Sequence, residues 1–418
     1  MYKRLFITLL STVVFAGCEM NPVTGKRELS LVSTQQELAI GTQQYKSSQQ
    51  SQGGRYMIAP ELNTYIDSVG QTLAKLSDRP ELPYEFVVLN NDVPNAWALP
   101  GGKIAINRGL LVLLEDEAQL AAVLGHEIVH AAARHGANQL SRNSLLQFGV
   151  DIISQTSDNN LYGTLAGLGA SAVNARYGRD DELEADFYGI NYMVKAGYDP
   201  QAAVELQQTF LKLSQKGGQG GWLDGLLASH PPSAERVNKN QQRAKQLPKG
   251  KRNKAAYQNA IRQLKNDQPA YQLHANALKV AKKKDWAKAQ TLTSLAIKQQ
   301  SNEARFHITL GRLLNETKDY HGAIQSYNRA EKLEPSYFAP FFYRGLSHQQ
   351  NQQYKAAQKD LIASNRLLET GIANYYLGEI ALINNQRSSA INYYRKASQT
   401  GGNVGKAAVE KLKTLGVQ

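Results

Sequence analysis

The C-terminal third of the chain repeats one pattern of small and aromatic residues every 33 or 34 positions. In one copy the pattern consists of Gly311, Ala323, Tyr327, Ala330 and Pro335. The corresponding residues of the other copies are Ala277, Ala289, Thr293 and Ala296, then Gly345, Ala357, Leu361 and Ser364, then Gly378, Ala390, Tyr394 and Ala397. Small residues at fixed offsets let two helices approach closely, so each copy is expected to form a helix pair that stacks on the next.

This register resembles that of the tetratricopeptide repeat (TPR), and four copies predict an all-α TPR solenoid over residues 270–418. Trp286, Tyr320 and Tyr354 keep the same spacing. An unrelated helical bundle is the alternative, and a register kept at several positions in four copies argues against it. A basic connector is expected before the array, over residues 248–269.

The N-terminus has the pattern of an export signal. Two basic residues precede an apolar stretch, residues 5–15, that is too short to span a bilayer comfortably. The sequence Phe-Ala-Gly-Cys at residues 15–18 resembles the lipobox of bacterial lipoproteins. The resemblance implies a signal peptide over residues 1–17 and a lipid on Cys18, and Glu19 implies sorting to the outer membrane. A plain signal peptide with an incidental cysteine is the alternative.

The net charge of +13 lies almost wholly in one segment, residues 236–300, which holds 16 Lys and Arg against 2 Asp. A nucleic-acid partner is excluded, because export separates the chain from nucleic acid and no recognised binding motif accompanies the charge. A solvated helix face is the expected role. Attraction to anionic lipid or to an acidic partner is the functional alternative.

The middle of the chain carries the sequence HEIVH at residues 126–130. The spacing of apolar residues predicts a helix over residues 115–140, and His126 and His130 would then share one face and could reach one Zn²⁺. Glu127 is placed to act as general base. A chance match on an ordinary helix is the alternative. His135 would lie about 180° round this helix from His126, which predicts a structural or supporting role rather than ligation.

A third ligand has to come from another segment. Residues 178–190 predict a second helix that carries Glu182 and Asp186 one turn apart. Glu182 can supply a carboxylate to zinc, and Asp186 can accept a hydrogen bond from a ligand histidine. A merely acidic helix face is the alternative, since Asp181 and Glu184 are further carboxylates on the same segment.

Together these motifs resemble the zinc metallopeptidase family that includes HtpX and the CAAX prenyl proteases, and most closely its periplasmic β-barrel assembly-enhancing (BepA-type) and lipoprotein (LoiP-type) members. The resemblance covers about residues 20–245, and the segments that carry it are residues 21–25, 95–102, 117–130 and 229–237. It implies a mainly α chain with a gluzincin-type metallopeptidase domain, helices plus a small β-sheet, over residues 51–247. Residues 18–50 would form an N-terminal segment.

The resemblance also implies the roles of individual residues. One Zn²⁺ per chain would be held by His126, His130 and Glu182, with Glu127 as general base and Asp186 as support. His230 is a possible fourth ligand that keeps the enzyme latent or a further catalytic-site residue, and the alternative is a histidine that anchors a turn.

Substrate contacts are expected from Asn95, Ala96 and Arg236, although Arg236 could instead pair with an acidic residue. The β-like residues 103–107 could offer an exposed edge to an extended peptide, with a structural hairpin as the alternative. The Gly- and Ala-rich residues 161–175 are expected to form a packed helix or a lid.

The resemblance implies a lipid-anchored zinc metalloendopeptidase of the periplasm, held at the outer membrane and acting in outer-membrane protein quality control and assembly. Its substrates would be misfolded or stalled outer-membrane proteins, and the TPR part would contact substrates or the β-barrel assembly machinery. A chaperone or adaptor with little proteolytic activity is the alternative.

Overall fold

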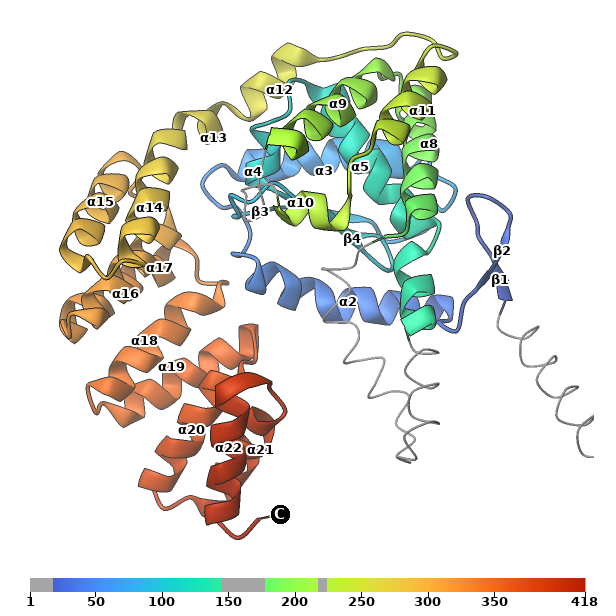
Figure 1. The fold of residues 1–418 in the computed structure, drawn as a ribbon. Coiled ribbons are helices and arrows are strands. Elements are labelled where there is room, and N and C mark those ends of the chain that lie inside the picture. Colours follow the sequence, from blue (N-terminus) through green and yellow to red (C-terminus); the bar gives the residue numbers. More distant parts are fainter. Residues whose placement is uncertain (1–17, 144–176, 217–223, 418) are drawn as a thin grey trace, which may run out of the picture. The chain divides into compact units, whose positions relative to one another are not determined.

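The computed structural model describes residues 18–143, 177–216 and 224–417 (Figure 1). The expected signal peptide and the Gly- and Ala-rich residues 161–175 lie outside these described residues. The chain divides into two compact units, residues 1–263 and residues 264–418. Within the described ranges, no helix has both the length and the apolar character needed to cross a membrane.

The first unit combines helices with two small sheets. Its elements are β1 (Cys18–Met20), β2 (Arg27–Leu29), α2 (Thr34–Ser51), α3 (Pro60–Ala74), β3 (Glu85–Leu89), β4 (Ala96–Leu99), β5 (Lys103–Asn107), α4 (Arg108–Leu111), α5 (Glu117–Ala132), α8 (Arg179–Lys195), α9 (Gln201–Lys216), α10 (Asp224–Ser229), α11 (Ala234–Ala244) and α12 (Lys254–Ala260). Strands β1 and β2 form an antiparallel hairpin. The short helix α13 (Arg262–Asn266) crosses the boundary between the units.

A three-stranded sheet lies at the centre of the first unit, with strand order β3-β5-β4. Strand β5 is parallel to β3 and antiparallel to β4. The sequence places a possible substrate-binding edge at residues 103–107. That expectation is wrong in its position, because these residues form the central strand β5 and both of its sides are paired. The edge strands are β3 and β4.

Helices cover both faces of this sheet (Figure 1). On one face, Tyr45 of α2 belongs to a buried apolar cluster with residues from all three strands, namely Val87, Leu89, Trp97, Leu99 and Ala105. On the other face, Gly70 of α3 lies so close to the Phe86 ring that a Cβ atom there would stand 2.6 Å from it. Helix α5 packs against β4, β5 and α3, which places it in the core of the unit.

Helix α5 is buried along its whole length. It begins where the Asp116 side chain accepts a hydrogen bond from the Gln119 backbone amide, a standard N-cap. The sequence predicts one helix over residues 115–140, but α5 ends at Ala132 and Arg134 has a φ of +62°. Helical residues resume at 135. The break reorients every side chain that follows it.

Residues 250–257 pack onto the first unit, although the sequence predicts them as part of a connector. Lys251 forms a bridge with Tyr198, and Arg252 Nε lies 2.7 Å from Asp116 Oδ2, at the N-cap of α5. The Tyr257 side chain is fully buried. The compact unit therefore extends to residue 263.

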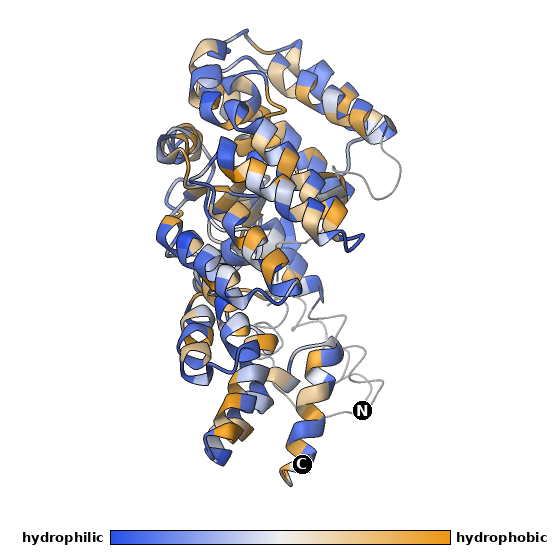
Figure 2. Ribbon diagram, turned by 90° about the vertical axis from the view of Figure 1, so that its left-hand side faces the viewer, coloured by the Kyte–Doolittle hydropathy of each residue, from blue (hydrophilic) through white to orange (hydrophobic). Residues whose placement is uncertain are grey.

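The second unit is a series of antiparallel helix pairs. The pairs are α14 (Gln268–Ala281) with α15 (Trp286–Gln299), α16 (Ala304–Glu316) with α17 (Tyr320–Leu333), α18 (Phe338–Gln350) with α19 (Tyr354–Leu367), and α20 (Gly371–Ile383) with α21 (Arg387–Ser398). Helix α22 (Gly402–Thr414) packs on the last pair. The helices carry hydrophobic and hydrophilic residues side by side, as amphipathic helices do (Figure 2).

The small residues of the repeat lie where the two helices of a pair touch. A Cβ atom on Gly311 would stand 2.6 Å from the Tyr327 ring, and one on Gly378 would stand 2.7 Å from the Tyr394 ring. In each of these pairs, the small residue of the first helix makes room for the large ring of the second helix. This complementarity explains why the pattern repeats at the same spacing. The predicted fold class, a domain of helices plus a small β-sheet followed by an all-α array of stacked helix pairs, is confirmed.

Candidate metal centre

Three candidate residues come from helix α5. His126, Glu127 and His130 are 9%, 2% and 1% exposed, so the whole HEIVH turn is withdrawn from solvent. Buried imidazoles and carboxylates need partners, because an isolated buried charge is very costly. The neighbouring helix α8 supplies them.

Two glycines set the distance between α5 and α8. A Cβ atom on Gly189 would stand 3.0 Å from the His126 backbone nitrogen, and one on Gly125 would stand 3.0 Å from the Gly189 carbonyl. This close crossing brings Glu182 and Asp186 of α8 against the histidines of α5. A side chain at either glycine would push the two helices apart.

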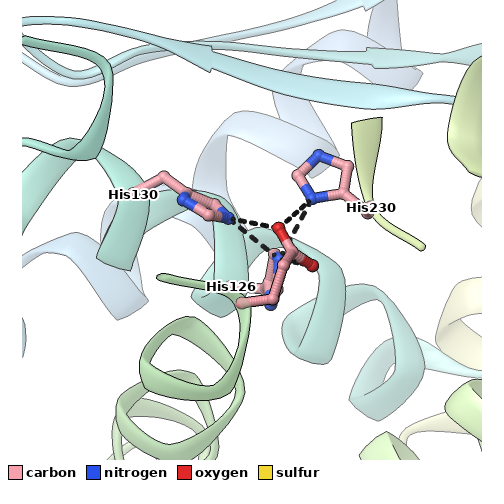
Figure 3. A group of neighbouring side chains, drawn as sticks. His126, His130 and His230 are labelled. Atoms are coloured by element: carbon pink, nitrogen blue, oxygen red, sulfur yellow. Dashed lines mark hydrogen bonds and ion pairs between the residues drawn. The ribbon is translucent and has the colours of Figure 1, made fainter. Parts of the chain in front are cut away.

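Four donor residues converge on one point: His126, His130, Glu182 and His230 are all buried, and one ligand atom from each lies within 4.8 Å of the others (Figure 3). The Nε2 atoms of His126 and His130 are 3.0 Å apart. His230 Nδ1 lies 3.3 Å from His126 Nε2 and 2.9 Å from Glu182 Oε1. Ligands at about 2.0–2.1 Å from a tetrahedral zinc ion are separated by roughly 3.3 Å. The donor set therefore fits one zinc ion.

The charges around the cluster favour a cation. Burial by itself would lower the pKa of His126, but the carboxylates of Glu182 and Asp186 raise that pKa to about 10. Burial also opposes ionisation of Glu182, and the neighbouring His230 and His126 outweigh it, so the pKa of Glu182 is well below its usual value. An ionised carboxylate among imidazoles is the state that binds a metal ion.

Glu127 lies beside the cluster rather than in it. Its Oε1 atom is 3.4 Å from His230 Nε2, and its Oε2 atom is buried with no hydrogen-bond partner among the described residues. Burial raises the pKa of Glu127, although His230 and His126 oppose the rise. A carboxylate of raised basicity next to a metal site can take a proton from a water molecule there.

Asp186 and Arg236 support the cluster from outside. His126 Nδ1 lies 3.1 Å from Asp186 Oδ1, so the Nε2 atom is left to face the other donors. Arg236 places Nε 2.7 Å from Asp186 Oδ2 and Nη1 2.6 Å from Glu182 Oε2. Burial would raise the pKa of Asp186, but the Arg236 guanidinium holds it below its usual value. Of the roles considered for Arg236, the structure shows the pairing with acidic residues.

Sequence reasoning did not assign contacts to two side chains that touch His130. The ring of Tyr177 stacks on His130 with centroids 3.7 Å apart and an angle of 16°. His135 Nδ1 lies 2.8 Å from His130 Nδ1. The argument that His135 faces away assumes an uninterrupted helix, and the break at Arg134 removes that assumption. No local pattern in the sequence predicts the contact between Tyr177 and His130.

The edge strand β4 passes beside this centre. The Asn107 amide donates to the Asn95 carbonyl at 2.9 Å, so by antiparallel alternation the backbone groups of Ala96 and Ala98 point away from β5. The Tyr177 hydroxyl donates to the Ala98 carbonyl at 3.3 Å. Asn95 itself accepts a hydrogen bond from the Ser229 hydroxyl, next to His230.

An apolar pocket opens next to His126 and Glu127. Ala96 forms part of its wall, and the large apolar side chains that line it are Leu110, Val123, Ile190, Met193, Leu206, Phe210 and Leu226. The centre therefore combines a metal-binding donor set, a basic carboxylate, an edge strand and an apolar pocket. These are the parts of a metallopeptidase domain.

Residues 60–244 match the sequence profile of peptidase family M48. This part of the chain is an M48 domain, which confirms the resemblance that the motifs suggest.

Three relatives show how far the similarity extends. The chain is 30% identical over 227 residues to mitochondrial metalloendopeptidase OMA1 of Schizosaccharomyces pombe, covering 54% of this chain and 66% of the relative. It is 29% identical over 272 residues to the β-barrel assembly-enhancing protease of Escherichia coli K12, covering 59% and 54%. It is 27% identical over 233 residues to metalloprotease YcaL of Escherichia coli K12, covering 51% and 89%. The chain thus spans between half and two thirds of the length of the first two relatives.

Proposed function

We propose that this chain is a zinc metalloendopeptidase with one zinc ion held by His126, His130 and Glu182. The observation that carries the proposal is the buried four-residue donor cluster with the Glu127 carboxylate beside it. The M48 domain and the metallopeptidase relatives support it.

A bound zinc ion would supply Lewis acidity to the hydrolysis of a peptide bond. Glu127 takes the proton of the attacking water and later returns it to the leaving amine. Asp186 keeps the proton of His126 on Nδ1, and Arg236 keeps Asp186 ionised and in place. The buried walls of the site exclude competing water.

A peptide substrate would bind in extended form along β4. The outward backbone groups of Ala96 and Ala98 can pair with its main chain, as in other strand-addition complexes. The adjoining pocket, with Leu110, Met193 and Phe210 in its wall, would accept an apolar side chain next to the cleaved bond. Asn95 contributes by holding the loop that carries His230, through Ser229.

His230 makes the resting enzyme latent in this proposal. Its Nδ1 atom takes the fourth position of the cluster, which a catalytic zinc site otherwise leaves open to water. The same closed donor set favours a second candidate function, a chaperone or adaptor whose zinc is structural.

The setting of the enzyme is proposed from sequence and relatives together. The export-signal pattern and the lipobox-like residues 15–18 support a location in the periplasm, with lipid on Cys18 as the proposed anchor to the outer membrane. A related protein is named for β-barrel assembly, so misfolded or stalled outer-membrane proteins are the proposed substrates. The TPR array would dock them or the β-barrel assembly machinery, since stacked repeats form extended binding surfaces.

Hydrolysis of casein by the purified chain and by Glu127→Gln tests the activity. The variant removes the base but keeps the ligands, so zinc content should stay near one per chain while the rate falls by about 10²–10⁴-fold. Equal rates of casein hydrolysis by the two proteins would support the adaptor instead. So would casein hydrolysis that metal chelators do not inhibit.

A further inference from the structure

Asn21 connects the β1–β2 hairpin, which begins at Cys18, to the metal centre through a chain of hydrogen bonds. The Asn21 Nδ2 group donates to Glu28 Oε1 at 2.8 Å and to Glu184 Oε1 at 2.9 Å. Its Oδ1 atom accepts from the backbone amides of Val23 and Thr24. Asn21 is 2% exposed, and both hydrogens and both lone pairs of its amide are used.

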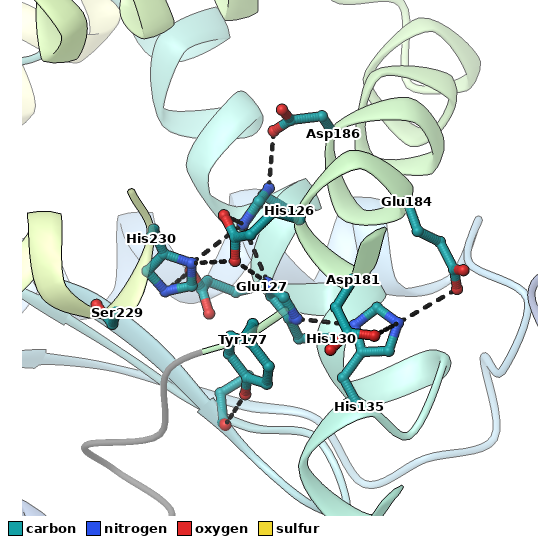
Figure 4. A network of polar contacts seen from close by, with 12 residues as sticks. His126, Glu127, His130, His135, Tyr177, Asp181, Glu184, Asp186, Ser229 and His230 are labelled. Atoms are coloured by element: carbon teal, nitrogen blue, oxygen red, sulfur yellow. Dashed lines mark hydrogen bonds and ion pairs between the residues drawn. The ribbon is translucent and has the colours of Figure 1, made fainter. Parts of the chain in front are cut away.

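Glu184 continues the chain of contacts toward the metal ligands (Figure 4). Its Oε1 atom lies 3.3 Å from His135 Nε2, and His135 Nδ1 lies 2.8 Å from His130 Nδ1. If Nε2 of His130 faces the ion, Nδ1 carries the proton and donates to His135 Nδ1. The proton of His135 is then on Nε2 and points to Glu184. Each donor meets an acceptor along the whole path, so the geometry defines both tautomers.

We propose that the N-terminal hairpin positions one ligand of the metal centre. Glu28 holds Asn21, Asn21 holds Glu184, and Glu184 positions the ligand His130 through His135. The inference rests on the proposed function. It assigns definite positioning roles to three features that the sequence leaves less defined: a further carboxylate of an acidic helix face, a histidine expected only in a general supporting role, and a short motif after the export signal.

The two histidine ligands on α5 are therefore oriented in different ways. His126 is held directly by Asp186, which belongs to the same helix as Glu182. His130 is held through a second imidazole that ends on a carboxylate shared with another segment of the chain. Outer partners of metal ligands orient the ring and raise its basicity, so loss of the shared carboxylate should weaken metal binding.

Independent contacts hold the hairpin in its place. Asn138 Nδ2 donates to Glu28 Oε2 at 2.6 Å, and the Leu31 amide donates to Ser141 Oγ at 2.9 Å. Arg134, at the break after α5, pairs with Glu19 of β1. The segment that follows Cys18 is thus held in place by contacts with residues 134–141, which come directly after α5.

The test compares zinc binding by the full chain and by matched variants. Asn21→Asp keeps the Oδ1 acceptor of the turn, removes both N–H donors and places a carboxylate against Glu28 and Glu184. Glu184→Leu removes the acceptor, whereas Glu184→Gln keeps an oxygen at Oε1. Lys26→Ala, an exposed change in the same hairpin, is the control.

Zinc affinity of the metal-free proteins, measured by chelator competition, should fall by about 10–100-fold for Asn21→Asp and Glu184→Leu. Glu184→Gln should recover most of the affinity, and Lys26→Ala should match the parent chain. The visible spectrum of the Co²⁺-loaded protein should change in the same two variants, because it reports ligand orientation.

Parent-like affinity and spectra in Asn21→Asp and Glu184→Leu would overturn the inference. Circular dichroism checks folding, and if Asn21→Asp unfolds, the comparison of Glu184→Leu with Glu184→Gln decides alone. If the parent chain binds zinc and cleaves casein while the variants match it, only this inference fails. If the parent chain binds no zinc, the proposed function fails first.

Discussion

At the scale of single residues, the proposed latency of the centre depends on His230. Its ring closes the donor set from the loop after α10, while its Nε2 atom faces Glu127 at 3.4 Å. One imidazole therefore occupies the position that water needs and also contacts the base that would activate that water. Such a residue can suppress turnover in the resting state without removing any part of the catalytic apparatus.

Replacing His230 by alanine should raise proteolysis, including self-cleavage, because the fourth position becomes open to water. The rate should increase roughly tenfold for each 1.4 kcal/mol by which the four-ligand state is favoured. Zinc should stay bound through His126, His130 and Glu182, and Glu127→Gln in the same background should abolish the gain. A lower kcat at full zinc occupancy would instead make His230 a donor in the transition state.

At the scale of elements, β4 and the helices beside it decide how a substrate can approach. The outward carbonyl of Ala98 accepts a bond from Tyr177, whose ring covers the ligand His130. The edge strand is thus partly capped by a side chain of the centre itself. A substrate that adds to β4 has to replace this hydrogen bond.

The Tyr177→Phe variant lacks the hydroxyl, so a substrate would no longer have to displace the hydrogen bond between Tyr177 and the Ala98 carbonyl. The ring can still stack on His130, so zinc content should not change, while the Ala98 carbonyl becomes available to a peptide amide. A neutral hydrogen bond contributes about 0.5–1.5 kcal/mol, which predicts a KM lower by roughly 2–10-fold for an extended peptide. A fall in kcat at constant KM would show that the hydroxyl acts in the transition state.

The helix pair α16–α17 carries a second element-scale prediction. Burial, together with the nearby Glu303 carboxylate, raises the pKa of Glu334 at the end of α17 to about 9. In the unfolded chain this carboxyl ionises near its usual value of about 4.3. The folded state therefore holds the proton more tightly, and its stability must decline as the pH rises from about 4.3 toward 9.

Glu334→Gln should remove that decline. At pH 8 the variant should be more stable than the parent chain by about 2–5 kcal/mol, and near pH 5 the two should be similar. Urea unfolding at both pH values measures the difference, with the exposed Glu316→Gln as the matched control. A parent chain whose stability does not fall between pH 5 and 8 contradicts the assignment.

At the scale of the whole molecule, the chain consists of two compact units, and the boundary between them lies after residue 263. Residues 250–257 complete the metallopeptidase unit. Asn253 Nδ2 donates to Glu117 Oε1 at 2.6 Å, and the Tyr257 hydroxyl donates to the Leu111 carbonyl. The contact with Glu117 stabilises the start of α5, the helix that carries the HEIVH residues, and the contact with Leu111 holds the end of α4.

Truncation should reveal this boundary. A chain that ends at Gln263 should keep its zinc and its thermal midpoint but lose partners that dock on the TPR array. A chain that ends at Gln246 should be less stable by about 3–5 kcal/mol, because the buried carboxylate of Asp116 loses its pairing with Arg252. Calorimetry and zinc content compare the two. Partners that still co-purify with the Gln263 chain would dock elsewhere.

The sequence by itself determines the features that depend on neighbours along the chain. Helical spacing puts His126 and His130 on one face, and a 34-residue register defines the stacked pairs, because both follow from the geometry of a single helix or a single repeat. The family resemblance then implies Glu182 as a third ligand and His230 as a possible fourth. The tertiary structure decides the rest, because it depends on segments distant in sequence. The crossing at Gly125 and Gly189 sets how closely α8 approaches α5, strand pairing makes β5 central rather than an edge, and the backbone break at Arg134 turns His135 toward His130.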